Sequence, residues 1–326
     1  MHPKSVPMVQ QFKEAFRRVV FGSSNLHQQC AIGLRDPQSE VSVWLNGPGM
    51  CRDVTYRNVM AAAQPLTLGV GLEGKCDAAA IIRSRPSLEF RERGGNNRLL
   101  GKISLRLTDV IPVGGERLYL FQVRNCRNYC LPRARLWAHY LYYAYRRWRA
   151  CGRPAGSTYR MVANELHSVF VFYICPRPVV LVSVSDGNLA NIFPMDLIGP
   201  VAPRHFALAL HSTSTVVPLI ERSLKIALSS VPVEQTAMAY QLGKNHKLSS
   251  VDGAHLPFAT TPSATFGIPV PRFSLRVKEM QIEAVRAVGS HKLFLANTVE
   301  VEDWAEGPQL FHVHGLYNAR RHQAQG

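Results

Sequence analysis

A run of polar side chains at residues 211–215 has the composition of an anion-binding site. Its members are His211, Ser212, Thr213, Ser214 and Thr215. They follow the short apolar run Phe206–Leu210, which predicts a strand. Clustered hydroxyls and free backbone N–H groups at a strand end can hold a phosphate without a full positive charge. The alternative is a Ser/Thr-rich turn that only caps a helix in the next segment, VVPLIERSLKIAL.

Further polar groups follow the preceding strand, which is predicted by the aliphatic run Val179–Val184. A turn at residues 186–188, Asp-Gly-Asn, leads into a second strand. The candidate residues here are Asn188, Leu189, Ala190 and Asn191. The Asn191 amide can both donate and accept hydrogen bonds, so it could contact a ligand ring or chain.

Three cationic or imidazole side chains complete the candidate set. Lys244 and Lys247 lie in a basic loop after a predicted helix and could neutralise a phosphate. The alternative for them is an ordinary helix C-terminus. His291 enters a predicted strand directly after Gly289-Ser290, although a lone histidine is more often a surface or core residue than a ligand.

In collinear order these segments resemble the flavin reductase-like, FMN-binding split-barrel family. The resemblance lies in the tripeptide Leu189-Ala190-Asn191, Phe193, a bend at Gly199-Pro200 and the turn Ser212–Thr215. Downstream it continues through residues 266–270, Glu283, residues 289–294 and the closing segment 308–317, which ends on Gly-x-Tyr. It covers about residues 165–320. Leu189 and Ser290 depart from the family pattern, which has Thr and Asp at these positions.

This resemblance implies a mainly β fold with flanking helices, an FMN-binding split β-barrel. It implies FMN in preference to FAD as the flavin, with NADH or NADPH as the electron donor. The implied cofactor-binding residues are Asn188, Leu189, Ala190, Asn191, Ser212, Thr213, Ser214, Thr215, Lys247 and His291. No catalytic acid or base is expected, because the two cofactors carry the hydride chemistry and the protein mainly positions them.

The function expected from the resemblance is NAD(P)H-dependent reduction of FMN, with a partner oxygenase as one user of the reduced flavin. An alternative is a non-catalytic flavin-binding or redox-sensing module that recruits an anionic partner. A third alternative is a nucleic-acid-associated protein in which the barrel is structural, but Trp137–Arg149 is more simply explained by an amphipathic helix than by nucleic-acid binding. No GxGxxG fingerprint opens a predicted strand–helix unit, and Walker, HExxH and GxSxG motifs are absent from the sequence.

Charge divides the 326 residues into two unequal parts. Residues 1–160 hold 25 Lys and Arg against 10 Asp and Glu, whereas the remainder is nearly neutral with 13 against 12. The simple interpretation is an Arg-rich solvated surface, and the functional one is an anionic partner. The length favours two domains, which we place at 1–160 and 161–326, with a linker near Cys151–Pro154.

The basic N-terminal half contains echoes of the C-terminal one. Residues 53–74 resemble the family's loop, proline bend and second strand, and residues 117–123 parallel residues 291–299. These echoes predict a degenerate split barrel, although any hairpin-rich domain produces similar ones. Because barrels of the resembled family usually form homodimers, we expect either a homodimer or two halves packed as a pseudo-dimer through a large apolar interface.

The seven cysteines are odd in number and irregularly spaced, which favours reduced thiols over disulfides and predicts no metal site. The N-terminal segment has no uninterrupted apolar core and predicts a short amphipathic helix over residues 9–21. The most apolar stretch, around residues 169–184, is interrupted by Pro176 and Pro178 and is too short for a bilayer span. We therefore expect a cytoplasmic protein without membrane contact.

Overall fold

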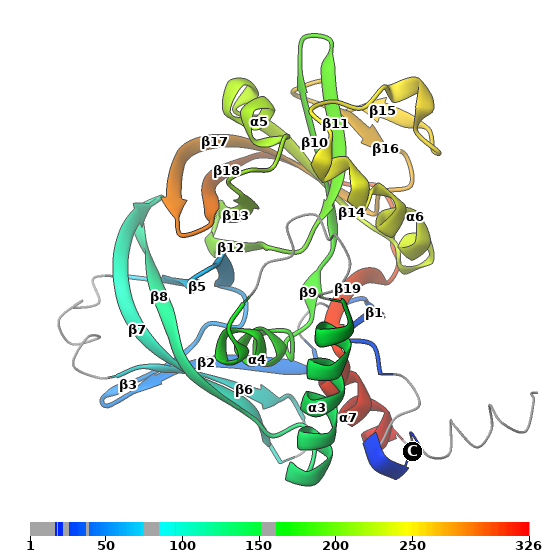
Figure 1. The fold of residues 1–326 in the computed structure, drawn as a ribbon. Helices are drawn as coiled ribbons and strands as arrows, with labels where there is room; N and C mark the ends of the chain where they lie inside the picture. The colour runs from blue at the N-terminus through cyan, green and yellow to red at the C-terminus, as the bar shows by residue number, and fades with distance from the viewer. Residues whose placement is uncertain are drawn as a thin grey trace, which may run out of the picture.

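The computed structural model describes residues 17, 19–21, 26–36, 39–74, 85–94, 96–150 and 161–325. Two strongly curved antiparallel sheets of seven strands dominate these residues, one above the other in Figure 1. A three-stranded sheet and a two-stranded ribbon complete the β structure. The mainly β fold with flanking helices is thereby confirmed.

The first sheet has the strand order β3-β2-β6-β7-β8-β5-β4. Its strands are β2 (Val41–Gly47), β3 (Met50–Asp53), β4 (Asn58–Ala63), β5 (Leu66–Leu72), β6 (Ser87–Glu92), β7 (Leu99–Val113) and β8 (Glu116–Asn128). Strands β7 and β8 form the long hairpin on the left of Figure 1.

The second sheet has the strand order β11-β10-β14-β17-β18-β13-β12. Its strands are β10 (Val180–Asp186), β11 (Leu189–Met195), β12 (Ile198–Ala202), β13 (His205–His211), β14 (Lys225–Ser230), β17 (Arg276–Val288) and β18 (His291–Asp303). Here β17 and β18 form the long hairpin.

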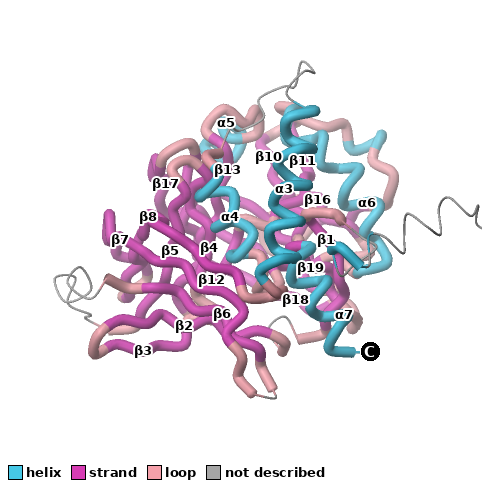
Figure 2. Tube along the Cα trace, turned by 60° about the horizontal axis from the view of Figure 1, so that its bottom comes forward, coloured by secondary structure: helices cyan, strands magenta, loops and turns pink. Residues whose placement is uncertain are grey.

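The remaining elements join and cover these sheets. Strand β19 (Gln309–His314) lies between β1 (Gln29–Leu34) and β9 (Arg177–Pro178), while β15 (Thr260–Pro262) pairs with β16 (Pro269–Pro271). The helices are α3 (Arg133–Ala150), α4 (Ala163–Phe172), α5 (Val217–Ser223), α6 (Thr236–Gln241) and α7 (Gly315–Gln325), with 3-10 turns η1 (Val233–Gln235), η2 (Leu242–Lys247) and η3 (Gly253–His255). Figure 2 shows α3, α6 and α7 gathered on one side of the strands. None of the described helices is both long enough and apolar enough to cross a membrane.

The two large sheets share one topology. One strand order becomes the other when each strand of the first sheet is replaced by its counterpart in the second. The counterparts are β2 and β10, β3 and β11, β4 and β12, β5 and β13, β6 and β14, β7 and β17, and β8 and β18. Their long hairpins also share both register shifts, which start at Ser104 and Leu107 in one and at Glu279 and Ile282 in the other, 175 positions apart in each case. Because bulges fix local register and twist, this agreement supports a tandem duplication.

The halves pack through an apolar interface. Its buried residues come from β4, β7 and β8 on one side and from β12, β13 and β18 on the other. Val59 and Leu120 meet Val201 and Leu293 in this cluster. The arrangement is that expected of a pseudo-dimer within one chain.

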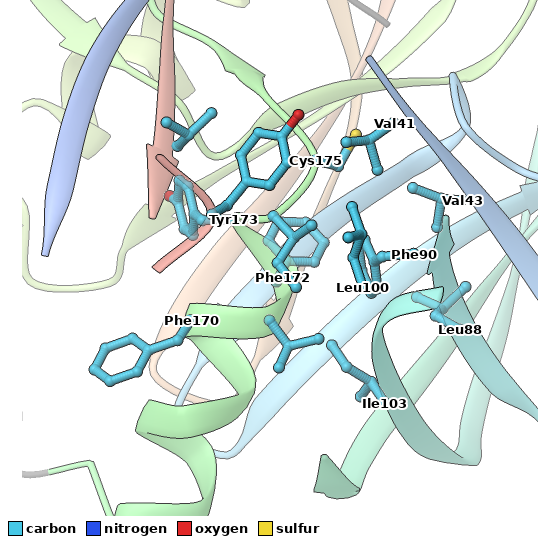
Figure 3. Packing of buried hydrophobic residues seen from close by; sticks show 14 of the residues in the cluster. Val41, Val43, Leu88, Phe90, Leu100, Ile103, Phe170, Phe172, Tyr173 and Cys175 are labelled. Carbon is cyan, nitrogen blue, oxygen red and sulfur yellow. The ribbon is translucent and has the colours of Figure 1, made fainter. Parts of the chain in front are cut away.

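The division at residue 160 stays a prediction, and the cores do not follow it strictly. The hydrophobic core of the first sheet includes Phe170–Cys175 as well as Phe311 and Val313. In Figure 3 the side chain of Phe172 lies beside Leu100 and Phe90 of the first sheet, and Cys175 lies beside Val41. Strand β1 in turn pairs with β19 near the end of the chain.

Several local predictions are confirmed and three are wrong. The strands predicted at Val179–Val184 and Phe206–Leu210 and the helix predicted over Trp137–Arg149 are present. Residues 53–63, where the resemblance implies a loop before Pro65, contain strand β4 instead. The segment 216–228 is helical only over Val217–Ser223 and then becomes β14, because Leu224 adopts a left-handed φ of 53°. Gly199-Pro200 lies within strand β12, next to a register shift. Of the helix predicted at 9–21, residues 17 and 19–21 are helical and the rest lies outside the described residues.

Candidate flavin site

The hydroxyl turn Ser212–Thr215 connects strand β13 to helix α5. Ser212 donates both its backbone N–H and its hydroxyl to the Ser290 carbonyl, at 3.0 and 3.1 Å. Thr213 bonds the Nδ1 atom of His211 through its N–H at 3.1 Å and its hydroxyl at 2.6 Å. These bonds hold the turn against the β17–β18 hairpin and leave the side chains of Ser212, Thr213 and Thr215 exposed.

The other end of the turn contacts the 3-10 turn η2. Ser214 and Thr215 both donate their hydroxyls to the His246 carbonyl, at 3.1 and 3.2 Å. Lys247 is the next residue along η2 and its side chain is exposed. The fold therefore brings Lys247 to the hydroxyl turn, two groups that are 32 positions apart in the sequence.

The segment Asn188–Asn191 lies on the β10–β11 hairpin. Asn188 and Leu189 are exposed, and Ala190 accepts a backbone hydrogen bond from Val251 at 2.7 Å. Asn191 is 1 % exposed and its amide nitrogen donates to the carbonyls of Asn245 and Leu248. Its Oδ1 is buried without a partner among the described residues. Asn191 thus anchors η2, and its direct contact with a ligand stays a prediction.

His291 opens strand β18 beside the hydroxyl turn. It is 5 % exposed and its ring lies 5.5 Å from that of His211, the residue opposite it in strand β13. Burial, with a smaller contribution from His211, lowers the pKa of His291 to about 4. The imidazole is therefore neutral near pH 7, and its Nδ1 lies 3.4 Å from the Ala63 nitrogen and 2.9 Å from the Ser290 hydroxyl.

The β4–β5 turn of the first half borders this site and forms hydrogen bonds to it. Gln64 donates its N–H to the Ser290 hydroxyl at 3.1 Å, and the Ser290 N–H donates to the Gln64 carbonyl at 2.7 Å. Gly289 approaches so closely that a Cβ there would lie 2.3 Å from the Gln64 oxygen. Residues from the two halves of the chain thus border one site.

The comparisons with known proteins bear on the second half. The family model described as "Flavin reductase like domain" matches residues 172–323. This range includes the hydroxyl turn, η2 and His291. Residues 172–323 form a flavin reductase-like domain.

Similar solved structures cover about half of the chain. An FMN-binding protein from Thermus thermophilus with bound p-hydroxybenzaldehyde is 19% identical over 47% of this chain and 81% of its own, with a TM-score of 0.38. The NADH:FAD oxidoreductase SgcE6 from Streptomyces globisporus C-1027 is 18% identical over 49% and 94%, with a TM-score of 0.41. The styrene monooxygenase flavin reductase from Pseudomonas putida S12 is 16% identical over 46% and 97%, with a TM-score of 0.39. No curated protein matches the chain.

The hydroxyl turn of the flavin reductase-like domain is compatible with a phosphate. Every hydroxyl in it already bonds a carbonyl or an imidazole. A bond to a phosphate oxygen is charge-assisted and about twice as strong as a neutral one, so rotation of the hydroxyl toward a bound phosphate is favourable. Lys247 would add a positive charge at the same place.

The corresponding place in the first half carries carboxylates. The 175-position correspondence puts Glu116 where the second half has His291. Arg57 forms ion pairs with Glu116 at 2.9 Å and with Glu73 at 2.7 Å. Carboxylates here repel a phosphate, which favours a single flavin site in the flavin reductase-like domain. The counterpart of the hydroxyl turn falls in residues 75–84, outside the described residues.

Sequence reasoning missed a partly buried chain of polar residues in this domain. Asp196 accepts hydrogen bonds from His312 Nδ1 at 2.8 Å and from the Tyr173 hydroxyl at 3.0 Å. The Tyr240 hydroxyl lies 2.7 Å from His312 Nε2, and the two rings stack with centroids 5.5 Å apart. The four residues come from segments far apart in the sequence and share no local motif, so no pattern could identify them. They tie α6 and β19 to the β11–β12 connection.

Proposed function

We propose that the chain is an NAD(P)H-dependent flavin reductase that binds FMN at the hydroxyl turn of its second half. The observation that carries the proposal is that Ser212–Thr215, Lys247 and His291 converge at one place inside the flavin reductase-like domain. A bound flavin supplies the hydride-accepting chemistry. The hydroxyls and Lys247 bind its phosphate, and the neutral His291 lies beside the hydroxyl turn.

The same proposal covers the electron donor and the user of the product. NADH or NADPH delivers the hydride, and reduced flavin passes to an acceptor such as a partner oxygenase. The first half occupies the position of a second subunit, since its β4–β5 turn bonds Ser290 and His291. We place the protein in the cytoplasm, where its free Cys30, Cys130 and Cys175 stay reduced.

A visible spectrum tests the flavin assignment directly. Protein mixed with FMN and freed of unbound ligand should absorb near ~450 nm and lose that band on addition of NADH or NADPH, because the flavin itself carries the chromophore and the redox chemistry. Protein that retains no flavin would contradict the proposal.

Alanine replacement at the hydroxyl turn tests its role. Ser212→Ala combined with Thr215→Ala should remove about 1–3 kcal/mol per charge-assisted bond, so FMN affinity falls at least tenfold. Riboflavin has no phosphate, and its affinity should change little. Ser223→Ala is the matched control, since its hydroxyl lies on α5 and bonds Ser185 and Lys225 instead. Titration of each variant with both ligands decides the matter, and equal losses for FMN and riboflavin would show that the turn does not bind phosphate.

One surface favours the second candidate function, a flavin-binding module that recruits an anionic partner. Helix α3 exposes four large apolar side chains at helical spacing: Trp137, Leu141, Tyr145 and Trp148, between 52 and 72 % exposed. Its last turns carry Arg146, Arg147 and Arg149. Exposed aromatic and arginine side chains together suit an anionic macromolecular surface.

Salt dependence distinguishes this candidate. Fluorescence anisotropy with single-stranded DNA should show weak binding that falls steeply between low and physiological salt, as counterion release requires. Replacing Arg146, Arg147 and Arg149 with Gln should weaken it further, whereas Arg272→Gln, an exposed arginine of the second half, should not. A tight, sequence-dependent complex at physiological salt would displace flavin reduction as the primary role.

A further inference from the structure

The two sheets differ in how the space beside their long hairpins is filled. In the first sheet the space is occupied by α4 and the residues after it. Phe172 packs with Ile103, Leu88 and Phe90 in one fully buried cluster (Figure 3). Val171 and Ile174 lie so close to β7 that a Cβ on Gly101 would be 2.6 and 2.7 Å from them. Side chains therefore fill the space on this side of the first sheet.

The corresponding space in the second sheet is a cavity of about 870 Å³. The pairing registers of the two sheets identify corresponding residues. The pair Ile103–Leu88 of the first sheet corresponds to Lys278–Leu228 of the second. The pair Val43–Phe90 corresponds to Val180–Ser230. Lys278, Leu228, Val180 and Ser230 all line the cavity. The cavity is open for two reasons. Ser230 occupies the position that Phe90 has in the first sheet, and α4 packs against the first sheet and not against the second.

Two cations of the cavity wall form no ion pair among the described residues. Lys278 Nζ lies 4.7 Å from the centre of the Phe206 ring. Burial lowers the pKa of this ammonium, Arg276 lowers it further, and Asp303, which also lines the cavity, opposes the shift. Arg276 itself is paired with Asp303. Lys278 forms no ion pair within the described residues, so an anion in the cavity would recover part of its desolvation cost.

Arg177 is the second cation. It is 4 % exposed and lies 3.7 Å from the Phe172 ring centre. Its terminal nitrogens donate to the Asn58 carbonyl, the Asn58 side chain and the Phe172 carbonyl. Its Nε is buried without a partner in the described part of the chain. An unsatisfied donor on a buried charge is costly, which indicates that a ligand atom belongs there.

We propose that this cavity binds an aromatic carboxylate, at a site separate from the flavin site. The ring takes the space that aromatic side chains fill in the first sheet, against Phe206, Leu228 and Trp304. The carboxylate accepts from Lys278 and from Arg177 Nε, one donor for each oxygen. One free guanidinium N–H and one ammonium suit a single negative charge better than a phosphate dianion. The proposal is independent of the proposed function, because neither cation touches the hydroxyl turn.

Binding of 2-naphthoate, followed by calorimetry and by the fluorescence of Trp304, tests the proposal. We expect 2-naphthoate to bind at least tenfold more tightly than the neutral 2-naphthamide. Lys278→Met should remove that preference and leave 2-naphthamide affinity unchanged. Lys278→Ile, the residue at the counterpart position of the first sheet, provides a second variant suited to an apolar wall.

Two further variants locate the binding in this cavity. Lys225 also lies over a phenylalanine, 5.1 Å from the Phe266 ring centre, but outside the cavity lining, so Lys225→Met should leave 2-naphthoate binding unchanged. Leu228→Trp should fill the cavity and abolish binding of both compounds. The proposal fails if neither compound binds, if 1-naphthyl phosphate binds more tightly than 2-naphthoate, or if FMN displaces 2-naphthoate.

Discussion

Gly71→Ala is expected to destabilise the whole protein by about 3 kcal/mol, because it forces the two halves apart. Gly71 lies in β5, and a Cβ there would be 1.9 Å from the Val201 carbonyl oxygen and 2.9 Å from the Val201 Cα. Val201 belongs to β12, which is held in its own sheet by pairing with β13. Backbone on both sides of the contact is fixed, so no side-chain rotation can relieve the overlap.

Gly69 provides the matched control, two residues earlier on the same face of β5. A Cβ on Gly69 would meet only side chains, Leu118 at 3.0 Å and Val59 at 3.1 Å, which can shift by a few tenths of an ångström. Gly69→Ala should therefore cost less than about 1 kcal/mol. Urea unfolding of both variants provides the comparison, and equal stabilities would show that the halves are not packed backbone to backbone.

The contacts between the halves recur in approximately symmetric pairs. The β17–β18 turn of the second half meets the first half where Gly289 approaches the Gln64 oxygen. The β7–β8 turn of the first half meets the second where a Cβ on Gly114 would be 2.2 Å from the His205 ring. Gly114 and Gly289 are again 175 positions apart. A duplicated chain packed about a pseudo-two-fold axis produces such pairs, as an isologous dimer does.

The sequence predicts strands well where one pattern dominates and poorly where the tertiary environment decides. Leu66–Leu72 is a continuous segment of apolar residues and one threonine, and it forms strand β5. Residues 58–63, NVMAAA, contain three alanines with high helix propensity, yet they form β4. Five of these six residues are buried, and β4 lies between its own sheet and the second half. The burial of β4 between the two halves outweighs the helix propensity of its alanines. This burial cannot be predicted from the local sequence.

The candidate site shows the same division. The hydroxyl turn can be predicted because its residues are consecutive and follow a strand. The role of Asn191 cannot, because its partners Asn245 and Leu248 lie 54 and 57 positions away. The contact between the Ala63 N–H and the His291 ring joins residues 228 positions apart, and it depends on how the two halves pack. Contacts of that range follow from the fold and not from spacing in the sequence.

Acid is expected to destabilise the protein chiefly through His314. This residue is 3 % exposed and stacks on Phe170 with ring centroids 4.0 Å apart. Its Nδ1 accepts the Leu316 N–H at 3.1 Å. Burial lowers the pKa of His314 to about 3, with smaller contributions from His139 and His167. The folded protein therefore keeps this imidazole neutral at pH values where the unfolded chain, with an ordinary pKa of about 6.5, protonates it.

The sign of the effect follows from that difference. The stability due to neutral His314 is fully present above about pH 6.5 and is lost as the pH falls toward 3, by about 5 kcal/mol in all. His314→Phe removes this titration and keeps the stacked ring. It loses the Leu316 hydrogen bond, about 1 kcal/mol at neutral pH, but its unfolding free energy should fall much less steeply between pH 7 and pH 4. His255→Phe, at an exposed histidine, should retain the wild-type slope. Urea unfolding across this range measures all three proteins, and parallel curves for wild type and His314→Phe would contradict the assignment. An NMR titration of His314 in the wild type measures the same pKa without any substitution.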